Sequence, residues 1–318
     1  MDWATELYEA LQPIISSEGN YPEARPLLAH YTSLSVLEAI AAHGEVWMSH
    51  PLLMNDTQEL IGGLDAARTV FLKSAPLQEG LGERAMEFLR WYETFESQFL
   101  TSDAFDTYIF CLCEHDPDDY DGALSMWRGY GGNGGGAAIV FRTASLIVVE
   151  ETPFILGRVS YRSAEQRDEL LASLAKKAAA MLQKDGPIDQ RPSEAAMILF
   201  RAALQCALFT KHSGFREEKE WRLVYMREMD PSPGDRRLHV HLGARGAEPK
   251  LRLAITTDPL LSGAPIHLDN LIERILLGPT ASSKLAVFAV QRMLGSHERT
   301  RLLSSSVTAS TTPFRVLA

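Results

Sequence analysis

The sequence predicts a single α+β domain over residues 1–318, in which helical segments are inserted into a sheet-forming core. Apolar residues recur every three or four positions in some segments, and short β-branched or aromatic runs occur in others. No internal repeat and no linker separates the two kinds of segment. Because the short apolar runs crowd together after residue 221, we expect the last third of the chain to be rich in strands.

The composition is that of an ordinary globular protein. Hydrophobic residues make up 46%, and 31 Lys and Arg against 41 Asp and Glu give a net charge of −10. Disorder, collagen and membrane spans are excluded. The acidic sum argues against non-specific binding along a phosphate backbone, although a local basic patch can oppose it. The first residues contain neither a basic run nor a long apolar stretch, so we expect a cytoplasmic protein without a signal peptide or a membrane partner.

The first fifty residues alternate between helices and short strands. Apolar spacing predicts a helix over 3–16, which serves as a packing helix within residues 1–20. Strands are expected over 27–31 and 45–48. Between them we expect a helix over 34–42, which Ser33 caps and Gly44 ends.

Two helical insertions are expected, over 57–102 and 163–210. The first contains a helix over 58–74, a break between Pro76 and Gly82, and a long helix with an apolar face from Leu81 to Phe99. The second contains helices over 163–184 and 193–209, the latter following Pro192.

The remaining elements are predicted strands, with one helix over 284–294. The strands are expected over 107–113, 137–142, 154–161, 221–227, 237–242, 250–256, 271–277 and 302–307. Residues 230–235 are expected to form a surface turn. Three cysteines, of which Cys111 and Cys113 lie in the first of these strands, suit a reducing compartment and buried positions.

A glycine-rich segment follows Trp127. Gly129, Gly131 and Gly134 match G-x-G-x-x-G, but the segment precedes a strand and does not join a strand to a helix, so the dinucleotide fingerprint fails its context test. Two interpretations stay open. Trp127 and Tyr130 stack on a planar ligand whose phosphate meets Arg128, or the segment is a hairpin connection whose aromatic residues cover the core edge.

Two carboxylates stand at the entrance of a hydrophobic strand. Glu218 and Glu220 share one side if the segment is extended, which suits acid/base work or stabilisation of developing positive charge. The alternative is a solvated loop with weak ion pairs. His30, at the end of an apolar strand, is similarly either a core histidine or part of a site.

Two further sets of polar residues are candidates for a site, one before a predicted helix and one on a predicted strand. Asn55, Asp56 and Glu59 suit a helix N-terminus, where they cap free N–H groups. His239 and His241 alternate on a predicted strand and would face one side. We see no third ligand at a telling spacing, so we expect no metal.

The order of these motifs resembles the bacterial family known as domain of unknown function 2971, from about residue 27 to the C-terminus. That family looks like a distant branch of the ADP-ribosyltransferase superfamily. The resemblance implies a mixed or antiparallel, split β-sheet core with helical insertions. The motifs that carry it are His30–Thr32, Val46–Ser49, Leu53–Glu59, Cys111–Cys113, Met126–Tyr130, Ala137–Phe141, Glu218–Arg222, Ile275–Pro279 and Ser310–Arg315.

By this resemblance the site binds and cleaves NAD. His30 would bind a ribose hydroxyl, the backbone at Tyr31, within the His30–Thr32 motif, would approach the nicotinamide amide, and Trp127 or Tyr130 would stack on the nicotinamide.

Arg128 would meet the diphosphate. Glu220 would be the catalytic carboxylate, and Glu218 would orient or deprotonate the acceptor. Asn55, Asp56, Glu59 and Arg222 would belong to a second wall of the cleft.

The expected activity is transfer of ADP-ribose from NAD to a macromolecular acceptor, either a protein or a nucleic-acid base, in phage defence or as a toxin. A neutralising partner protein is a further expected partner. Two alternatives stay open: an NAD glycohydrolase, in which water replaces the acceptor, and a non-catalytic module that senses a nucleotide or binds a protein.

Overall fold

The structure is a computed structural model that describes residues 3–15, 21–53, 57–102, 106–149, 152–183, 191–232, 237–243 and 246–314. The chain divides into two compact units. The helical unit comprises residues 1–20, 50–107 and 158–216, and the sheet unit comprises residues 21–49, 108–157 and 217–318. The N-terminal helix and both predicted insertions thus fall together in the helical unit, which is a compact body of its own.

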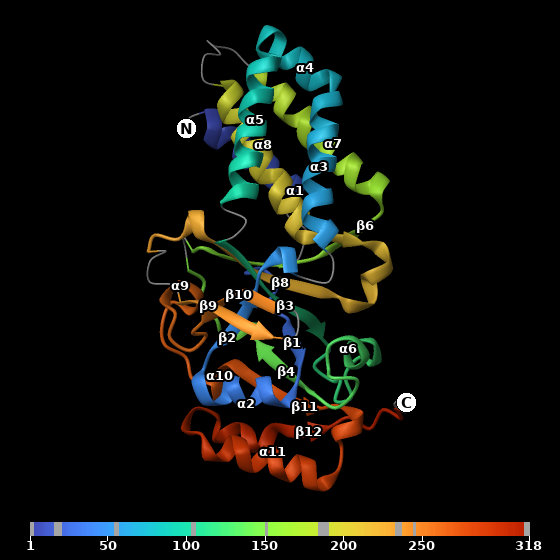
Figure 1. Cartoon of the computed structure of the whole chain (residues 1–318), viewed down its shortest axis with the longest axis vertical. Coiled ribbons are helices and arrows are strands. Elements are labelled where there is room, and N and C mark those ends of the chain that lie inside the picture. Colours follow the sequence, from blue (N-terminus) through green and yellow to red (C-terminus); the bar gives the residue numbers. More distant parts are fainter. Residues whose placement is uncertain are drawn as a thin grey trace. The chain divides into compact units, whose positions relative to one another are not determined.

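The helical unit is a bundle in which α8 is the central helix (Figure 1). Helix α8 contacts α1, α3, α5 and α7, and most of its side chains are buried. A short parallel pair of strands completes the unit. The elements are α1 (Trp3–Ile15), α3 (Thr57–Lys73), α4 (Ala75–Leu81), α5 (Ala85–Thr101), α7 (Ala164–Leu182), α8 (Arg191–Phe209), β6 (Ser160–Arg162) and β7 (Thr210–His212).

Aromatic side chains fill the centre of this bundle. The ring of Tyr92 meets Phe71 and Phe200 edge-on, with centroids 5.8 and 5.9 Å apart. Edge-to-face contacts of this kind are favourable beyond the apolar area that they bury. The predicted apolar face between Leu81 and Phe99 is therefore buried at Phe88, Tyr92 and Phe99, whereas Phe95 is half-buried.

Two predicted elements of the helical unit are corrected. The region from Pro76 to Gly82 is not a plain break, because Pro76 stands in the first turn of α4, which Ser74 caps. The expected long helix starts only at Ala85, since Gly82 has φ +55° and ψ −130°, a conformation outside the helical region.

The sheet unit is built on a mixed, mostly antiparallel sheet of ten described strands. Along its main path the order is β12-β11-β4-β1-β3-β2-β10-β9, and β8 pairs with β3 and β5. The strands are β1 (Leu27–Thr32), β2 (Val46–Ser49), β3 (Thr107–His115), β4 (Ala137–Arg142), β5 (Phe154–Arg158), β8 (Glu220–Met226), β9 (Arg237–Gly243), β10 (Gly246–Leu253), β11 (Ile272–Leu277) and β12 (Val307–Ala309). The predicted α+β class with a mixed or antiparallel sheet is confirmed.

Alternate residues of the strands pack against two different cores. One face contributes Leu28, Ile139 and Ile275 to a large apolar cluster, and the other contributes Ala29 and Val140 to a smaller cluster around Trp127. The helices of this unit are α2 (Leu34–His43), α6 (Leu124–Gly129), α9 (Pro259–Ser262), α10 (Leu268–Leu271) and α11 (Lys284–Ser296). Of these, α11 runs beside α2 and β12 in Figure 1.

Two strand predictions are corrected in part. Residues 302–306 form a 3-10 helix before β12, because Ser304 and Ser305 donate their hydroxyl hydrogens to the carbonyls of Arg301 and Leu302 and so favour a local turn. The predicted strand over 154–161 is divided into β5, which pairs with β8, and β6, which pairs with β7.

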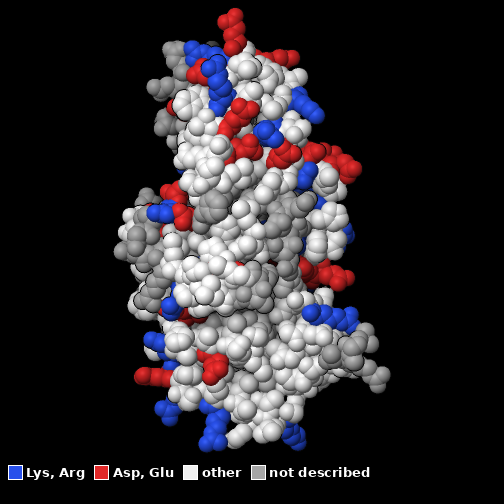
Figure 2. Space-filling model, in the orientation of Figure 1, with Lys and Arg blue, Asp and Glu red and all other residues white. Residues whose placement is uncertain are grey.

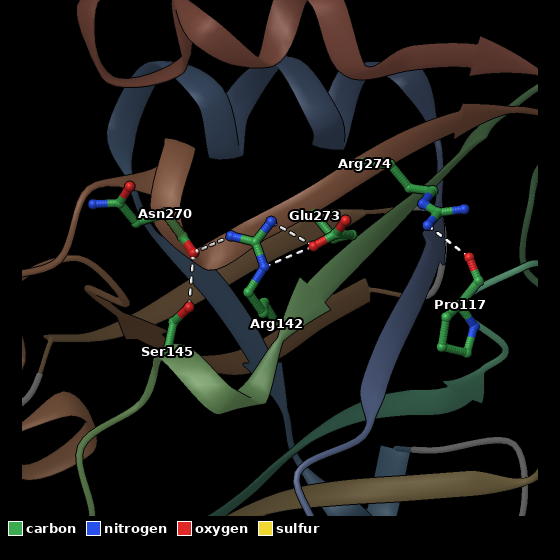
Figure 3. Close-up of polar contacts among 6 residues, drawn as sticks. All are labelled: Pro117, Arg142, Ser145, Asn270, Glu273 and Arg274. Carbon is green, nitrogen blue, oxygen red and sulfur yellow. Dashed lines mark hydrogen bonds and ion pairs between the residues drawn. The ribbon is translucent and has the colours of Figure 1, made fainter.

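Polar contacts fasten the end of β4 to β11 (Figure 3). Arg142 pairs with Glu273 and donates to the carbonyl of Asn270, which also accepts from the Ser145 hydroxyl at 2.9 Å. Farther along the strand, Arg274 donates to the carbonyl of Pro117 at 2.7 Å. The strand β11 therefore anchors the loop that precedes α6.

None of the helices in the described part of the chain is both long and apolar enough to cross a membrane. Figure 2 shows acidic and basic side chains intermixed on the helical unit, and a broad area with few charged side chains on the sheet unit.

A glycine substitution tests the close approach of the glycine-rich segment to β1. A Cβ on Gly136 would lie 2.1 Å from the carbonyl oxygen of Thr32, whereas a Cβ on Gly129 meets nothing within 4 Å. We expect Gly136→Ala to lower the free energy of unfolding by about 3 kcal/mol, as overpacking does. Gly129→Ala should change it by less than about 0.5 kcal/mol. Urea unfolding followed by circular dichroism measures both, and equal midpoints would contradict the packing described.

Candidate functional site

The sheet divides at β3. The first three residues of β1 pair with residues 113–115 of β3, and Ser49 of β2 pairs with Ile109. Backbone polar groups along a strand point alternately to its two edges, so the odd-numbered residues Ile109 and Cys113 address the same edge. Strands β1 and β2 therefore follow one another along one edge of β3, and Cys111 lies between the two pairings.

His30 bridges the place where β1 leaves β3. Its Nδ1 lies 2.9 Å from the carbonyl oxygen of Cys111. Since a carbonyl oxygen only accepts, Nδ1 carries the proton and donates, which leaves Nε2 as an acceptor in the neutral ring. The imidazole also packs on Phe110, with ring centroids 4.3 Å apart. Burial lowers the pKa of His30, so the neutral ring is the favoured form.

A cavity of about 760 Å³ opens beside this division of the sheet. Its walls come from β1, α2, β2, β3, β9 and β10, and all the lining residues belong to the sheet unit. The described residues that line it are His30, Thr32, Ser35, Val36, Ala39, Ile40, His43, Glu45, Trp47, Ser49, Phe110, His239, His241, Glu248, Lys250 and Arg252. Its volume lies within the range of small-molecule and cofactor sites.

One wall of the cavity is aromatic. Trp47 is 42% exposed although its chain neighbours Val46 and Met48 are buried. The rings of His239 and His241 lie 4.8 and 5.8 Å from the Trp47 ring, so the prediction that the two histidines face one side is confirmed. The two histidine rings are inclined to the Trp47 ring by 53° and 68°, so the exposed Trp47 ring alone is the platform on which a planar ligand can stack.

The charged groups of this wall are paired within the wall itself. Lys250 lies 3.1 Å from Glu248 and donates to the Ser49 hydroxyl at 3.0 Å. Arg252 pairs with Glu45 at 2.5 Å. The cations and carboxylates balance, so the wall can offer both hydrogen-bond donors and acceptors without a large net charge.

Two carboxylates of the Glu218–Arg222 motif lie at the start of β8. The Tyr130 hydroxyl donates to Glu218 at 3.0 Å, and the Tyr130 ring is 39% exposed. Lys219 then adopts φ +43°, and its carbonyl accepts from the N–H of Glu114 on β3. This left-handed residue sets the direction in which β8 begins.

Glu220 forms a buried ion pair with Arg222. The guanidinium donates to both carboxylate oxygens, at 2.8 and 3.2 Å, and both residues are buried. A bidentate pair fixes the orientation of a carboxylate as well as its position. The alternative of a solvated charge run is therefore wrong for Glu220 and Arg222.

Strand β3 lies between the two carboxylates and β1, because β8 pairs with β3 and β3 pairs with β1. Burial raises the pKa of the Cys113 thiol to about 12, and the negative charges of Glu218 and Glu220 contribute in the same direction. Cys113 pairs with Ala29, the residue before His30. The carboxylates are thus separated from β1 by a single strand, although they are not among the described residues that line the cavity.

Trp127 lies in the core, so Tyr130 is the aromatic residue of the two with an accessible ring. The Trp127 side chain is fully buried, donates to the carbonyl of Asp121 at 2.8 Å and meets the Tyr31 ring edge-on. The Tyr31 hydroxyl accepts from the N–H of Ala123. Stacking of Trp127 on a ligand is thereby ruled out by its burial.

The glycine-rich segment wraps around Trp127 and joins α6 to β4. The N–H groups of Gly131, Gly134 and Gly136 donate to carbonyls within residues 126–131, so these three are not directed at a phosphate. Asn133 has φ +51° and Gly134 has φ +86°, which explains why small or turn-forming residues stand there. The segment is thus a connection that its own backbone hydrogen bonds hold in place.

Arg128, on α6, is exposed. Its guanidinium lies over the ring of Phe314, 5.7 Å from the centroid. Its role toward a diphosphate stays a prediction. Asn55 and Asp56, together with the side chain of Glu59, lie outside the described residues.

Several cavity residues were missed from the sequence, above all Trp47, Lys250 and Arg252. A signal for Trp47 was present, because a tryptophan between two apolar residues of a short strand faces away from their side of the sheet. Lys250 and Arg252 alternate in the same way on β10, but only the pairing of β10 with β2 brings them beside Trp47. Among the residues that the structure describes, no group of three or more His, Cys, Asp or Glu gathers in a way that could hold a metal ion.

The pKa of His30 makes stability depend on pH. Its pKa in the folded chain is below the ordinary value of 6.5, so the unfolded chain takes up a proton first as the pH falls. We expect His30 to leave the free energy of unfolding undiminished above pH 6.5, and to lower it progressively as the pH falls below 6.5. His115, whose pKa burial also lowers, adds to the slope.

His30→Gln should therefore show a smaller decrease between pH 7 and pH 5 than the natural chain. Chemical unfolding at a series of pH values gives the slopes of the natural chain and of the variant, and an unchanged slope in His30→Gln would contradict the neutral state described for that ring.

The comparisons with known proteins bear on the segment that contains these carboxylates. A search of curated proteins and a search of solved structures gave no match. The model of a family described as "Protein of unknown function (DUF2971)" matches residues 126–223, from α6 into β8. This segment contains Tyr130, Glu218, Glu220 and Arg222. The chain is therefore similar to that family in the part that contains the Tyr130–Glu218 hydrogen bond and the Glu220–Arg222 ion pair.

Proposed function

We propose that the chain is an ADP-ribosyltransferase, which cleaves the nicotinamide–ribose bond of NAD and transfers ADP-ribose to a protein or nucleic-acid base. The observation that carries the proposal is the divided sheet. A neutral histidine stands in a cavity where β1 leaves β3, and an oriented carboxylate lies on β8 at the other edge of β3. The ordered motifs of the sequence, which resemble that superfamily, agree with this arrangement.

The cavity provides the groups that NAD binding requires. The Nε2 atom of His30 can accept a hydrogen bond from a ribose hydroxyl, because Nδ1 is already used toward Cys111. Thr32, two residues along β1, lines the same cavity, as does the Trp47 platform. A dinucleotide needs both a polar end for its ribose and flat surfaces for its rings.

Glu220 has the properties of a group that stabilises positive charge. When the bond between C1′ of the ribose and the nicotinamide nitrogen breaks, the electron pair leaves with nicotinamide and positive charge develops on the ribose. A carboxylate held in place before the reaction stabilises that charge without reorganisation. Arg222 acts as a positioning residue, since its two hydrogen bonds orient the Glu220 carboxylate.

Glu218 is suited to the acceptor. It is less buried than Glu220, and it takes a hydrogen bond from Tyr130, whose ring is accessible. A carboxylate in this place can take the proton from an acceptor nucleophile as that nucleophile attacks C1′. A role in phage defence or as a toxin, and a protein that neutralises the chain, belong to the same proposal and follow from the resemblance.

The role of Glu220 is tested with a neighbour as control. We expect Glu220→Gln to reduce nicotinamide release by at least ~100-fold, the scale observed when one fixed electrostatic group is removed. Glu217→Gln changes an exposed carboxylate of the same charge run and should leave the rate unchanged. Labelled NAD incubated with protein and cell lysate gives the rates. A folded Glu220→Gln variant that matches the natural rate would refute the assignment.

The role of Glu218 is tested through its partner. Tyr130→Phe removes the hydroxyl that donates to Glu218 and keeps the ring. We expect transfer of the label to macromolecules to decrease more than nicotinamide release, since the change affects the acceptor step. An equal decrease in both would contradict that division of roles. Release without transfer by the natural chain would indicate a glycohydrolase, and NAD binding without turnover would indicate a sensing module.

A further inference from the structure

Strand β9 lies at the edge of the sheet without the usual protection. In the described part of the chain it pairs with β10 and ends the strand order. Between Leu238 and Leu242 it contains no charged residue and no proline. Natural edge strands are commonly shielded by charges, prolines or bulges, because open N–H and C=O groups recruit another strand. An unshielded edge of this kind can accept a further strand.

The two faces of β9 have different surroundings. His239 and His241 face Trp47 in the cavity wall. On the opposite face Leu238, Val240 and Leu242 are 55%, 57% and 78% exposed. Three apolar side chains that follow one another on one face are thus open to solvent. Figure 1 shows β9 in the sheet unit, on which Figure 2, in the same orientation, shows a broad area with few charged side chains.

The pairing of β9 with β10 favours an arrangement in which the backbone N–H and C=O of Val240 point to the outer edge of the sheet. Val240 is opposite Pro249, and proline has no N–H. Opposite residues of antiparallel strands alternate between hydrogen-bonded (narrow) pairs, which exchange two N–H···O=C bonds, and non-hydrogen-bonded pairs. Because Pro249 cannot donate, Val240 and Pro249 suit a non-hydrogen-bonded pair, in which the backbone polar groups of Val240 point away from β10. Those groups are then directed at the edge where a further strand would add.

The sequence of β9 is complementary to itself. It reads Leu238-His239-Val240-His241-Leu242, which is the same in both directions about Val240. In an antiparallel pair of two such strands, Val240 faces Val240 of the partner subunit and Leu238 faces Leu242 of the partner subunit. A two-fold symmetric interface requires this kind of self-complementarity.

We infer that β9 is the interface between two copies of this chain, joined edge to edge about a two-fold axis at Val240. The six exposed apolar side chains form one continuous row across the axis, where cross-strand neighbours cover one another. On the other face, His241 of the partner subunit lies beside His239, so the second copy extends the wall of the cavity. The inference is independent of the proposed NAD chemistry.

Disulfide formation tests the register. In the proposed dimer Val240 is opposite Val240 of the partner subunit in a hydrogen-bonded (narrow) pair. The two Cα atoms of such a pair are about 5.5 Å apart, which is within the range of a disulfide. We expect Val240→Cys to form a covalent dimer under mild oxidation. Leu238→Cys should not, because the two copies of residue 238 are offset by about 13 Å along the strands.

The natural chain is the background control, since Cys113 and Cys206 are buried and Cys111 is half-buried. A mixture of Leu238→Cys and Leu242→Cys chains should cross-link, because these positions face each other. Cross-linking of Leu238→Cys alone as efficiently as Val240→Cys would overturn the register.

Sedimentation velocity of the full chain tests the dimer itself. We expect a dimer whose share rises with concentration, and Val240→Lys should be monomeric because it places two ammonium groups face to face. Leu285→Lys changes an apolar residue of α11 that is 77% exposed and should remain dimeric. Thermal unfolding shows that both variants are folded. A natural chain that stays monomeric at its highest soluble concentration, or a Val240→Lys variant that still dimerises, would overturn the inference.

Discussion

The hydrogen bond from His30 to the carbonyl of Cys111 is the interaction on which the arrangement of the sheet unit depends. Where β1 leaves β3, the ladder would give up a backbone bond, and a buried polar group without a partner is costly. The imidazole supplies a donor at that place. Since the ring is half-buried and neutral, it also keeps one acceptor directed away from the sheet. The division of the sheet and the chemistry of the cavity thus share one side chain.

The carboxylates of β8 depend on the same strand. Glu114 of β3 donates to Lys219, whose left-handed conformation starts β8, and the pair of Glu220 and Arg222 follows at once. On β11, which pairs with β4, Arg274 donates a hydrogen bond to the carbonyl of Pro117 in the loop before α6. Trp127 fills the core that the glycine-rich segment covers. The polar groups of the proposed site are therefore held by rigid strands and by a packed connection, with β3 at the centre.

Much of the fold could be predicted from local pattern. Alternation and helical spacing located β1, α2, β2 and α8, because buried faces leave a period in the sequence. The short helix α4 and the serine-rich turn at 302–306 were missed, since side-chain hydrogen bonds of Ser74 and Ser304 set the local backbone conformation against the apolar pattern. The candidate site was less predictable. Trp127 and Tyr130 look alike in sequence, but only packing separates a buried from an accessible ring, and Arg252 joins the cavity through strand pairing.

The most direct test of the account is a crystal structure of the chain with a non-hydrolysable NAD analogue. The account predicts that the analogue occupies the cavity beside His30, that a ribose hydroxyl lies within hydrogen-bond distance of Nε2, and that the ribose C1′ faces the Glu220 carboxylate. An analogue bound elsewhere on the chain, or bound with its ribose turned away from both residues, would contradict the claim that the divided sheet forms the site of NAD cleavage.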